Sequence, residues 1–97
     1  MDVLDAHDIG YILCTPGATP PAWLTGRHPD AAVMDAEGRR DRCQRRRHGC
    51  PNSESFMGPT LALTRLLAER YGRRDGLIGW QIDNELGHPV CYCSNCR

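Results

Sequence analysis

An α/β fold is predicted by two short apolar runs and by the amphipathic segment between them. The runs at residues 9–14 and 77–82 are rich in β-forming residues, lack helical spacing and are closed by turn-forming residues. Runs without polar alternation are typical of parallel strands buried on both faces. Residues 59–71 place their apolar side chains largely on one helical face, between Pro59 and the stop at Gly72. We therefore expect two adjacent parallel strands joined by a crossover helix.

The remaining segments predict connections rather than long elements. Residues 1–8 have helical spacing without an N-cap, so we expect the chain to start inside a helix, with a frayed terminus as the alternative. Residues 15–58 contain no long periodic segment, and so long a connection is usually functional or disordered. Within it, Pro20 and Pro21 disfavour helix before the second proline. Residues 35–40 have the glycine and charges of an exposed turn.

Composition gives no bias toward nucleic acid or membranes. All twelve basic residues are Arg, and they balance twelve Asp and Glu residues. No apolar run approaches the ~20 residues of a membrane span, and the first ten residues lack the basic start and apolar core of a signal peptide. We expect a soluble, cytoplasmic chain. The Arg-rich run at residues 39–47 would alone indicate nucleic-acid binding, but it has little aromatic interleaving for stacking bases.

The second apolar run ends in Asn84 and Glu85, which places a carboxylic acid at the tip of a strand. An apolar floor beneath such an acid raises its pKa by desolvation, so that it donates a proton near neutral pH. The general acid of a glycosidase needs such a raised pKa, because it must donate a proton to the leaving group. The alternative is that the two polar residues only end the strand in a turn.

Cysteine spacing indicates a metal site. Cys91, Cys93 and Cys96 form a Cys-x-Cys-x-x-Cys cluster in a chain with six cysteines. This spacing, together with the missing signal peptide, favours a metal over a disulfide framework. Tetrahedral zinc sites take four ligands, commonly four cysteines. We therefore expect zinc and a fourth ligand from elsewhere in the chain.

Three motifs resemble glycoside hydrolase family 42 β-galactosidases. Residues 79–85, Gly-Trp-Gln-Ile-Asp-Asn-Glu, with the following Cys-Tyr-Cys-Ser-Asn-Cys, resemble the acid/base segment of that family. Residues 18–24, Ala-Thr-Pro-Pro-Ala-Trp-Leu, resemble its signature after strand three, and residues 46–53 resemble its Arg-Arg-His-Tyr-Cys-Pro-Asn-Ser motif. The resemblance extends over about residues 5–96. It implies a (β/α)₈ barrel in which Glu85 is the proton donor and Asn84 binds the sugar.

The resemblance also implies roles for residues on the long connection. It implies that Arg46 contacts the substrate, whereas Arg45 and Arg47 are solvated or paired with carboxylates. It implies that Cys50 completes a closed structural zinc site, which would staple the loop of Arg46 to the loop after Glu85.

Some positions depart from the pattern or leave alternatives open. Gly49 replaces the Tyr of the family, so we expect the space of that ring to be unfilled. Cys14 is expected to be a buried free thiol and Cys43 an exposed one. His88 is an alternative metal ligand. Trp23 is expected to pin its loop to the barrel rim, with stacking on a sugar as the alternative.

The resemblance implies that residues 1–97 are a fragment of a catalytic barrel, from strand three to the loop after strand four. Such a barrel takes about 250 residues, so we expect two of its strands here, poor stability and no activity alone. It further implies retaining hydrolysis of terminal β-D-galactosides, a nucleophile beyond Arg97, and a homo-oligomeric parent enzyme, a homotrimer in many members. The alternatives are a zinc-binding module that contacts nucleic acid through its Arg-rich loop, and an inactive truncated gene product.

Overall fold

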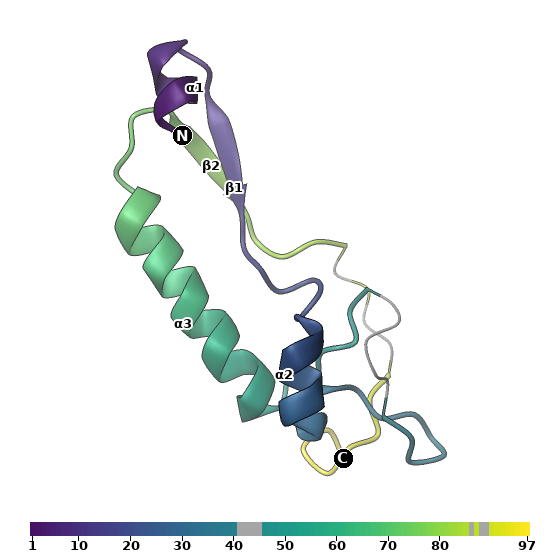
Figure 1. Ribbon diagram of the computed structural model, residues 1–97. Helices are drawn as coiled ribbons and strands as arrows, with labels where there is room; N and C mark the ends of the chain where they lie inside the picture. The colour runs from purple at the N-terminus through teal and green to yellow at the C-terminus, as the bar shows by residue number, and fades with distance from the viewer. Residues whose placement is uncertain (41–45, 86, 88–89) are drawn as a thin grey trace.

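The computed structural model describes residues 1–40, 46–85, 87 and 90–97. In chain order the elements are α1 (Asp2–Ala6), β1 (Tyr11–Cys14), α2 (Ala22–Arg27), the 3-10 helix η1 (Pro29–Ala31), α3 (Glu54–Tyr71) and β2 (Leu77–Gln81). The molecule is elongated, with extents of 52, 21 and 21 Å. Figure 1 shows α1 and the strands at one end, and α2 with the C-terminus at the other. No helix in these ranges is long and apolar enough to cross a membrane.

β1 and β2 form a parallel two-stranded sheet, which confirms the predicted pairing of the two apolar runs. Tyr11 lies opposite Leu77, and the register shifts between Tyr11 and Ile12. The first strand starts later than predicted because the backbone N–H of Ile9 donates to the Leu4 carbonyl at 3.0 Å. Residue 9 therefore belongs to the end of the α1 turn rather than to the sheet.

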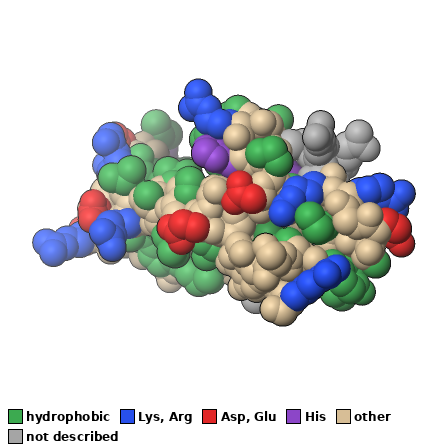
Figure 2. Space-filling model, turned by 90° about the horizontal axis from the view of Figure 1, so that it is seen from below, with side chains coloured by type: hydrophobic (Ala, Val, Ile, Leu, Met, Phe, Trp, Pro, Cys, Tyr) green, Lys and Arg blue, Asp and Glu red, His purple; other side chains and the backbone are tan. Residues whose placement is uncertain are grey.

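The predicted burial of both strands is wrong for the part of the chain that the structure describes. Ile78 is 71% exposed, and Ile12 and Ile82 are exposed as well. A parallel sheet is buried only when other layers cover both of its faces. Here α3 makes its main contacts with η1, and apolar side chains reach the surface in the view of Figure 2. The apolar pattern of the strands is typical of buried residues, but the described part of the chain provides no layer that covers these side chains.

The long helix starts at Glu54, earlier than the predicted start at Pro59, and ends at Tyr71 as predicted. A proline in a helix interior costs about 3 kcal/mol, which is why the prediction placed it in the first turn. Phe56 offsets this cost, because it is buried and burying a Phe contributes about 1.5–3 kcal/mol. The hydroxyl of Ser53 also donates to Asp30 at 2.9 Å and holds the entry to the helix.

The apolar face predicted for this helix is present but exposed. Its exposed members are Leu61, Leu63 and Leu66.

Two short helices occupy the connection in which no periodic segment was found. α2 starts directly after Pro21, whose backbone is extended at φ −65° and ψ 147°, so the prolines exclude helix as predicted. η1 follows at once. Leu24 and Ala31 from these helices pack with Phe56 in a small core. Elements this short do not show a helical period in the sequence.

A second small core lies under the loops and contains sulfur. Val33 packs there with Cys50 and Cys93, and all three are buried. Partly buried residues around it are Met34, Cys91 and Cys96. The cores of this chain therefore lie in its connections rather than between the sheet and α3.

The space beside Gly49 is filled, contrary to the expectation from the missing Tyr ring. A Cβ atom at this position would lie 2.6 Å from the ring of Phe56. Phe56 therefore takes the place that a side chain at position 49 would need.

Replacing Gly49 by Ala is expected to lower the free energy of unfolding by about 1–3 kcal/mol, the usual cost of overpacking a filled site. Gly26→Ala is the matched control, because its Cβ would meet nothing within 4 Å and Ala favours helix. Thermal melting followed by circular dichroism measures both. Equal melting temperatures for the two variants would contradict the packing of Phe56 on Gly49.

Candidate active site and metal centre

The carboxyl ends of the two strands are joined by hydrogen bonds, and the candidate site is built on this edge. The N–H of Thr15 donates to the Gln81 carbonyl at 3.0 Å. The N–H of Asp83 then donates to the hydroxyl of Thr15 at 2.7 Å, and the N–H of Asn84 to the carboxylate of Asp83 at 2.7 Å. The end of β1 thus holds the turn that carries Asn84 and Glu85.

The structure brings together the three residues predicted to act on a sugar. The guanidinium Nη1 of Arg46 lies 3.1 Å from Oε2 of Glu85, although the two residues are far apart in sequence. Asn84 precedes Glu85, and its Oδ1 accepts a hydrogen bond from Gln81 at 2.9 Å. The expected burial of Glu85 is absent in these residues, since its side chain is 69% exposed and that of Arg46 is 68% exposed.

Arg47 behaves differently from its neighbour. Its side chain is only 7% exposed, and Nη2 lies 3.1 Å from Oδ1 of Asp83. The same guanidinium donates to the Asn84 carbonyl, and the backbone N–H of Arg47 donates to Ala18 at 2.8 Å. The sequence left solvation and pairing with a carboxylate as alternatives for Arg47, and the structure shows the pairing. Arg45 lies outside the described residues.

Left-handed backbone is concentrated at this site. Arg47, Asp83 and Glu85 have φ values of 61°, 59° and 47°, and Asp8 is the fourth such non-glycine residue in the described ranges. This conformation is uncommon for residues with a Cβ and persists where surrounding contacts fix it. Two of these residues are the partners in the buried ion pair, which supplies such contacts.

Four cysteines form one cluster, as predicted. The sulfur of Cys50 lies 3.7 Å from that of Cys91, 3.7 Å from that of Cys93 and 3.5 Å from that of Cys96. All four sulfur atoms lie within 4.8 Å of one another. A tetrahedral Zn²⁺ with Zn–S bonds of about 2.3 Å needs sulfur atoms about 3.8 Å apart, so the cluster fits such an ion. The candidates Cys43 and His88 lie outside the described residues.

Hydrogen-bond donors around the cluster favour a thiolate at Cys91. Burial raises the pKa of the Cys50 thiol. Burial also acts to raise the pKa of Cys91, but N–H groups of Cys93 and Met34 outweigh it and lower that pKa to about 7. The side-chain amide of Asn52 donates to the sulfur of Cys96 at 3.3 Å and acts to lower its pKa, but burial and the contacts with Cys93 and Cys91 leave that pKa raised. Because the thiolate is the form that binds metal, the donors to Cys91 assist metal binding.

The prediction that Cys14 is buried is wrong in this structure. Cys14 is exposed, and its thiol donates to Oε1 of Gln81 at 3.1 Å. Trp23 is 63% exposed among the described residues, so its expected packing on the rim of a barrel stays a prediction.

The other described arginines of the Arg-rich run are bound within the chain. Arg39 pairs with Asp35 at 2.8 Å and with Glu37 at 3.1 Å, in the exposed turn that the sequence predicts. The N–H and the guanidinium of Arg39 also lower the pKa of Asp35. Arg40 donates to the carbonyls of Asp30 and Ala32. Arg39 and Arg40 therefore both have partners within the chain, and the side chain of Arg39 remains exposed.

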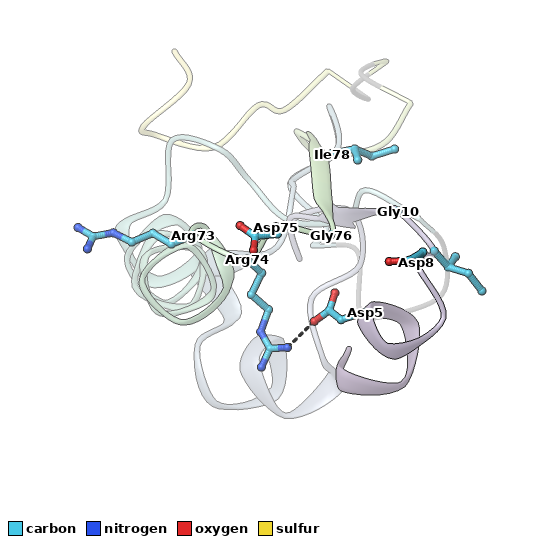
Figure 3. Close-up of a pocket in the computed structure, with 9 residues that line it drawn as sticks. Asp5, Asp8, Gly10, Arg73, Arg74, Asp75, Gly76 and Ile78 are labelled. Carbon is cyan, nitrogen blue, oxygen red and sulfur yellow. Dashed lines mark hydrogen bonds and ion pairs between the residues drawn. The ribbon is translucent and has the colours of Figure 1, made fainter.

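A separate pocket of about 670 Å³ lies where the strands begin (Figure 3). Arg74 points toward Asp5, with a distance of 2.8 Å between Nη1 and Oδ2. Its bond to Asp2 lowers the pKa of that carboxyl. Ligands of open α/β sheets bind at the carboxyl ends of the strands. The pocket lies at the amino ends of the strands, whereas Glu85 lies at their carboxyl ends.

The chain is a parallel β/α unit. A carboxylate and an arginine lie at the carboxyl edge of its sheet, next to a cluster of four cysteines. The family described as beta-galactosidase, glycoside hydrolase family 42, matches residues 1–97. The chain belongs to this family.

Individual relatives agree with the family match. The chain is 40% identical over 99 residues to the β-galactosidase LacZ of Heyndrickxia coagulans, and 43% identical over 97 residues to BgaA of a Thermus species. These matches cover 100% and 97% of this chain and 15% of each relative. The chain thus spans about 15% of the length of these relatives.

Solved structures show the same local fold. The β-galactosidase from Bacillus circulans sp. alkalophilus matches with a TM-score of 0.89 at 35% identity, over 98% of this chain and 14% of its own. The enzyme from Halorubrum lacusprofundi matches with a TM-score of 0.87 at 36% identity, over 98% of this chain and 15% of its own.

We predict that the cluster binds one thiophilic divalent ion, because the sulfur of Cys50 lies 3.5–3.7 Å from the other three, close to the separation that a tetrahedral ion needs, and all four lie within 4.8 Å of one another. Cobalt titration should give the absorption of tetrahedral thiolate coordination. Cys50→Ser should weaken binding most, since this sulfur contacts the other three, and Cys14→Ser should have no effect. A larger loss for Cys43→Ser than for Cys50→Ser would disprove this ligand set.

Proposed function

We propose that this chain is the acid/base segment of a retaining β-galactosidase, from strand three of a (β/α)₈ barrel to the loop after strand four. The observation that carries the proposal is the pairing of Glu85 with Arg46 at the carboxyl edge of the sheet, 3.1 Å apart. Catalytic groups of (β/α)₈ enzymes lie at this edge. The substrate class is terminal β-D-galactosides, as the names of the relatives suggest.

In the proposed mechanism, Glu85 protonates the oxygen of the leaving group and later takes a proton from the attacking water. A retaining enzyme needs a second carboxylate about 5–5.5 Å away as the nucleophile. Asp83 is near in sequence, but Arg47 binds its carboxylate. We therefore assign the nucleophile to a part of the enzyme other than these 97 residues.

Arg46 and Asn84 are assigned to hold the sugar. The ion pair of Arg46 is exposed, and exposed pairs contribute little, so sugar hydroxyls displace it readily. The Oδ1 of Asn84 is occupied by Gln81, so Asn84 offers its Nδ2 donor to the sugar. Hydrogen bonds to the sugar strengthen as the ring flattens toward the oxocarbenium-like transition state.

The metal in this proposal is a structural Zn²⁺ held by Cys50, Cys91, Cys93 and Cys96. Four protein ligands leave no position for water, so the ion would supply stability and no catalytic step. Hydrogen bonds already tie the same loops together, since Asn95 donates to the Asn52 carbonyl at 3.1 Å.

The chain alone is expected to show no measurable hydrolysis of nitrophenyl galactosides, because one carboxylate does not fill both roles. Activity is expected in a chimera of the Thermus enzyme BgaA in which this chain replaces the segment it matches. In that chimera, Glu85→Gln should lower kcat/KM for an alkyl galactoside by about 10²–10⁴, the range of general acid catalysis. The kcat/KM for a dinitrophenyl galactoside should fall much less, because its leaving group needs little protonation in the first step.

Glu37→Gln is the control for this experiment, since Glu37 is an exposed carboxylate paired with an arginine in a turn. Turnover by the isolated chain that Glu85→Gln abolishes would refute the need for a second carboxylate. Equal loss of kcat/KM for both substrates in Glu85→Gln would refute its role as the acid, because kcat/KM reports the step in which the leaving group departs.

In the same chimera, Asn84→Ala and Arg46→Ala are each expected to cost roughly 2–4 kcal/mol of transition-state binding, the scale of preorganised donors. The loss should appear in kcat and not only in KM. Arg39→Ala serves as the control, because that side chain is 75% exposed and bound to turn carboxylates. If the activity of the two variants falls only in step with their melting temperature, Asn84 and Arg46 are structural.

A further inference from the structure

Arg47 is a buried cation that the proposed chemistry leaves without a role. Its side chain is 7% exposed, and it comes from the long connection rather than from the strands. It reaches across to the turn after β2, where it binds the carboxylate of Asp83 at 3.1 Å and the carbonyl of Asn84. The guanidinium thus contacts the two residues that directly precede Glu85.

These contacts belong to a network that joins three segments of the chain. Asp83 also accepts a bond from the N–H of Asn84 at 2.7 Å, and its own N–H donates to the hydroxyl of Thr15 at 2.7 Å. The backbone N–H of Arg47 donates to Ala18 at 2.8 Å. The end of β1, the turn after β2 and the long connection are therefore locked at one point.

The energetics of this pair favour a geometric role over a stabilising one. Arg47 is buried and Asp83 is 27% exposed, and an ion pair largely withdrawn from water gains little net stability, because desolvation of the charges offsets their attraction. Both partners also adopt left-handed backbone, at φ 61° for Arg47 and 59° for Asp83. Such conformations cost about 1–3 kcal/mol each and persist where the surroundings over-determine them. What the pair supplies is one fixed conformation of the turn.

We propose that Arg47 is a positioning residue, which fixes the turn at residues 83–85 through Asp83 and the Asn84 carbonyl and so aims Glu85 at the glycosidic oxygen. The inference rests on the proposed function. General acid catalysis requires the acid within hydrogen-bond reach of the atom it protonates, and a misplacement of 1 Å costs about 100-fold. Arg46 contacts the turn through the exposed side chain of Glu85, whereas Arg47 binds the carboxylate of Asp83 and the backbone carbonyl of Asn84.

The first test uses the 97-residue chain and needs no activity. Solvent exchange of single amide protons is measured by NMR in the unmutated chain, Arg47→Met and Arg40→Met. Arg40 is the matched control, because it also donates to backbone carbonyls from the same connection, at Asp30 and Ala32. Exchange of the Asp83 and Asn84 amides is expected to rise at least about ten-fold in Arg47→Met only. Unchanged exchange at these two amides would overturn the proposal.

The second test uses the chimera with BgaA. Arg47→Met is expected to slow an alkyl galactoside by about 100-fold and a dinitrophenyl galactoside by less than about ten-fold, because a misplaced acid matters most for a poor leaving group. Arg47→Lys should recover part of the loss, since an ammonium binds Asp83 but lacks the fork that also reaches Asn84. Arg40→Met should slow both substrates equally, if at all.

The outcomes separate this inference from the function on which it rests. Equal slowing of both substrates by Arg47→Met, in step with a lower melting temperature, would make Arg47 structural while Glu85→Gln still reports the acid. Lack of any leaving-group effect in Glu85→Gln would instead remove the proposed function. If Arg47→Met fails to fold, Arg47→Lys and Asp83→Asn decide the matter, and normal leaving-group dependence in both would overturn the proposal.

Discussion

The contact of Cys50 with the three cysteines near the C-terminus is the interaction on which the rest of the candidate site depends. Its sulfur atom lies 3.5–3.7 Å from the other three, and with Val33 these residues form a buried core. The connection that carries Arg46 leads directly into Cys50, and the loop after Glu85 leads directly into Cys91. The loop that carries Arg46 and the loop that follows Glu85 are therefore both attached to one small core. This core lies in the connections and not between α3 and the sheet.

Within that frame, two neighbouring arginines have opposite surroundings, with Arg46 exposed and Arg47 buried. The left-handed backbone at Arg47 turns the chain sharply, so that successive side chains leave in different directions. An exposed cation is free to exchange its partner for a ligand, whereas a buried pair is costly to separate. The proposed roles, sugar binding for Arg46 and positioning of the turn for Arg47, thus differ because the two side chains differ in burial and not in residue type.

The sequence predicted what depends on local pattern. The two strands, the end of α3 at Tyr71 and the cysteines near the C-terminus follow from apolar runs, a stop signal and ligand spacing, whereas Cys50 was assigned from the family resemblance. The burial of single side chains could not be predicted from local pattern, because it depends on packing partners that are distant in sequence. Ile78 and Trp23 have the character of core residues and are exposed, and the ring of Phe56 fills the space beside Gly49. Similarly, nothing in a run of identical arginines shows that Arg47 is the buried one.

The exposed sheet explains why the site is organised by its loops. A fully buried Ile contributes about 1.5–3 kcal/mol, and Ile12, Ile78 and Ile82 are exposed in the described chain. The sheet therefore supplies little of the free energy that orders residues 83–85. The sulfur core anchors the loops on either side of these residues, and the bonds that Thr15 and Arg47 make to Asp83 fix the conformation of the turn. Since a metal that binds only the folded cluster adds its binding free energy to folding, ion binding would strengthen this arrangement without any change at the strands.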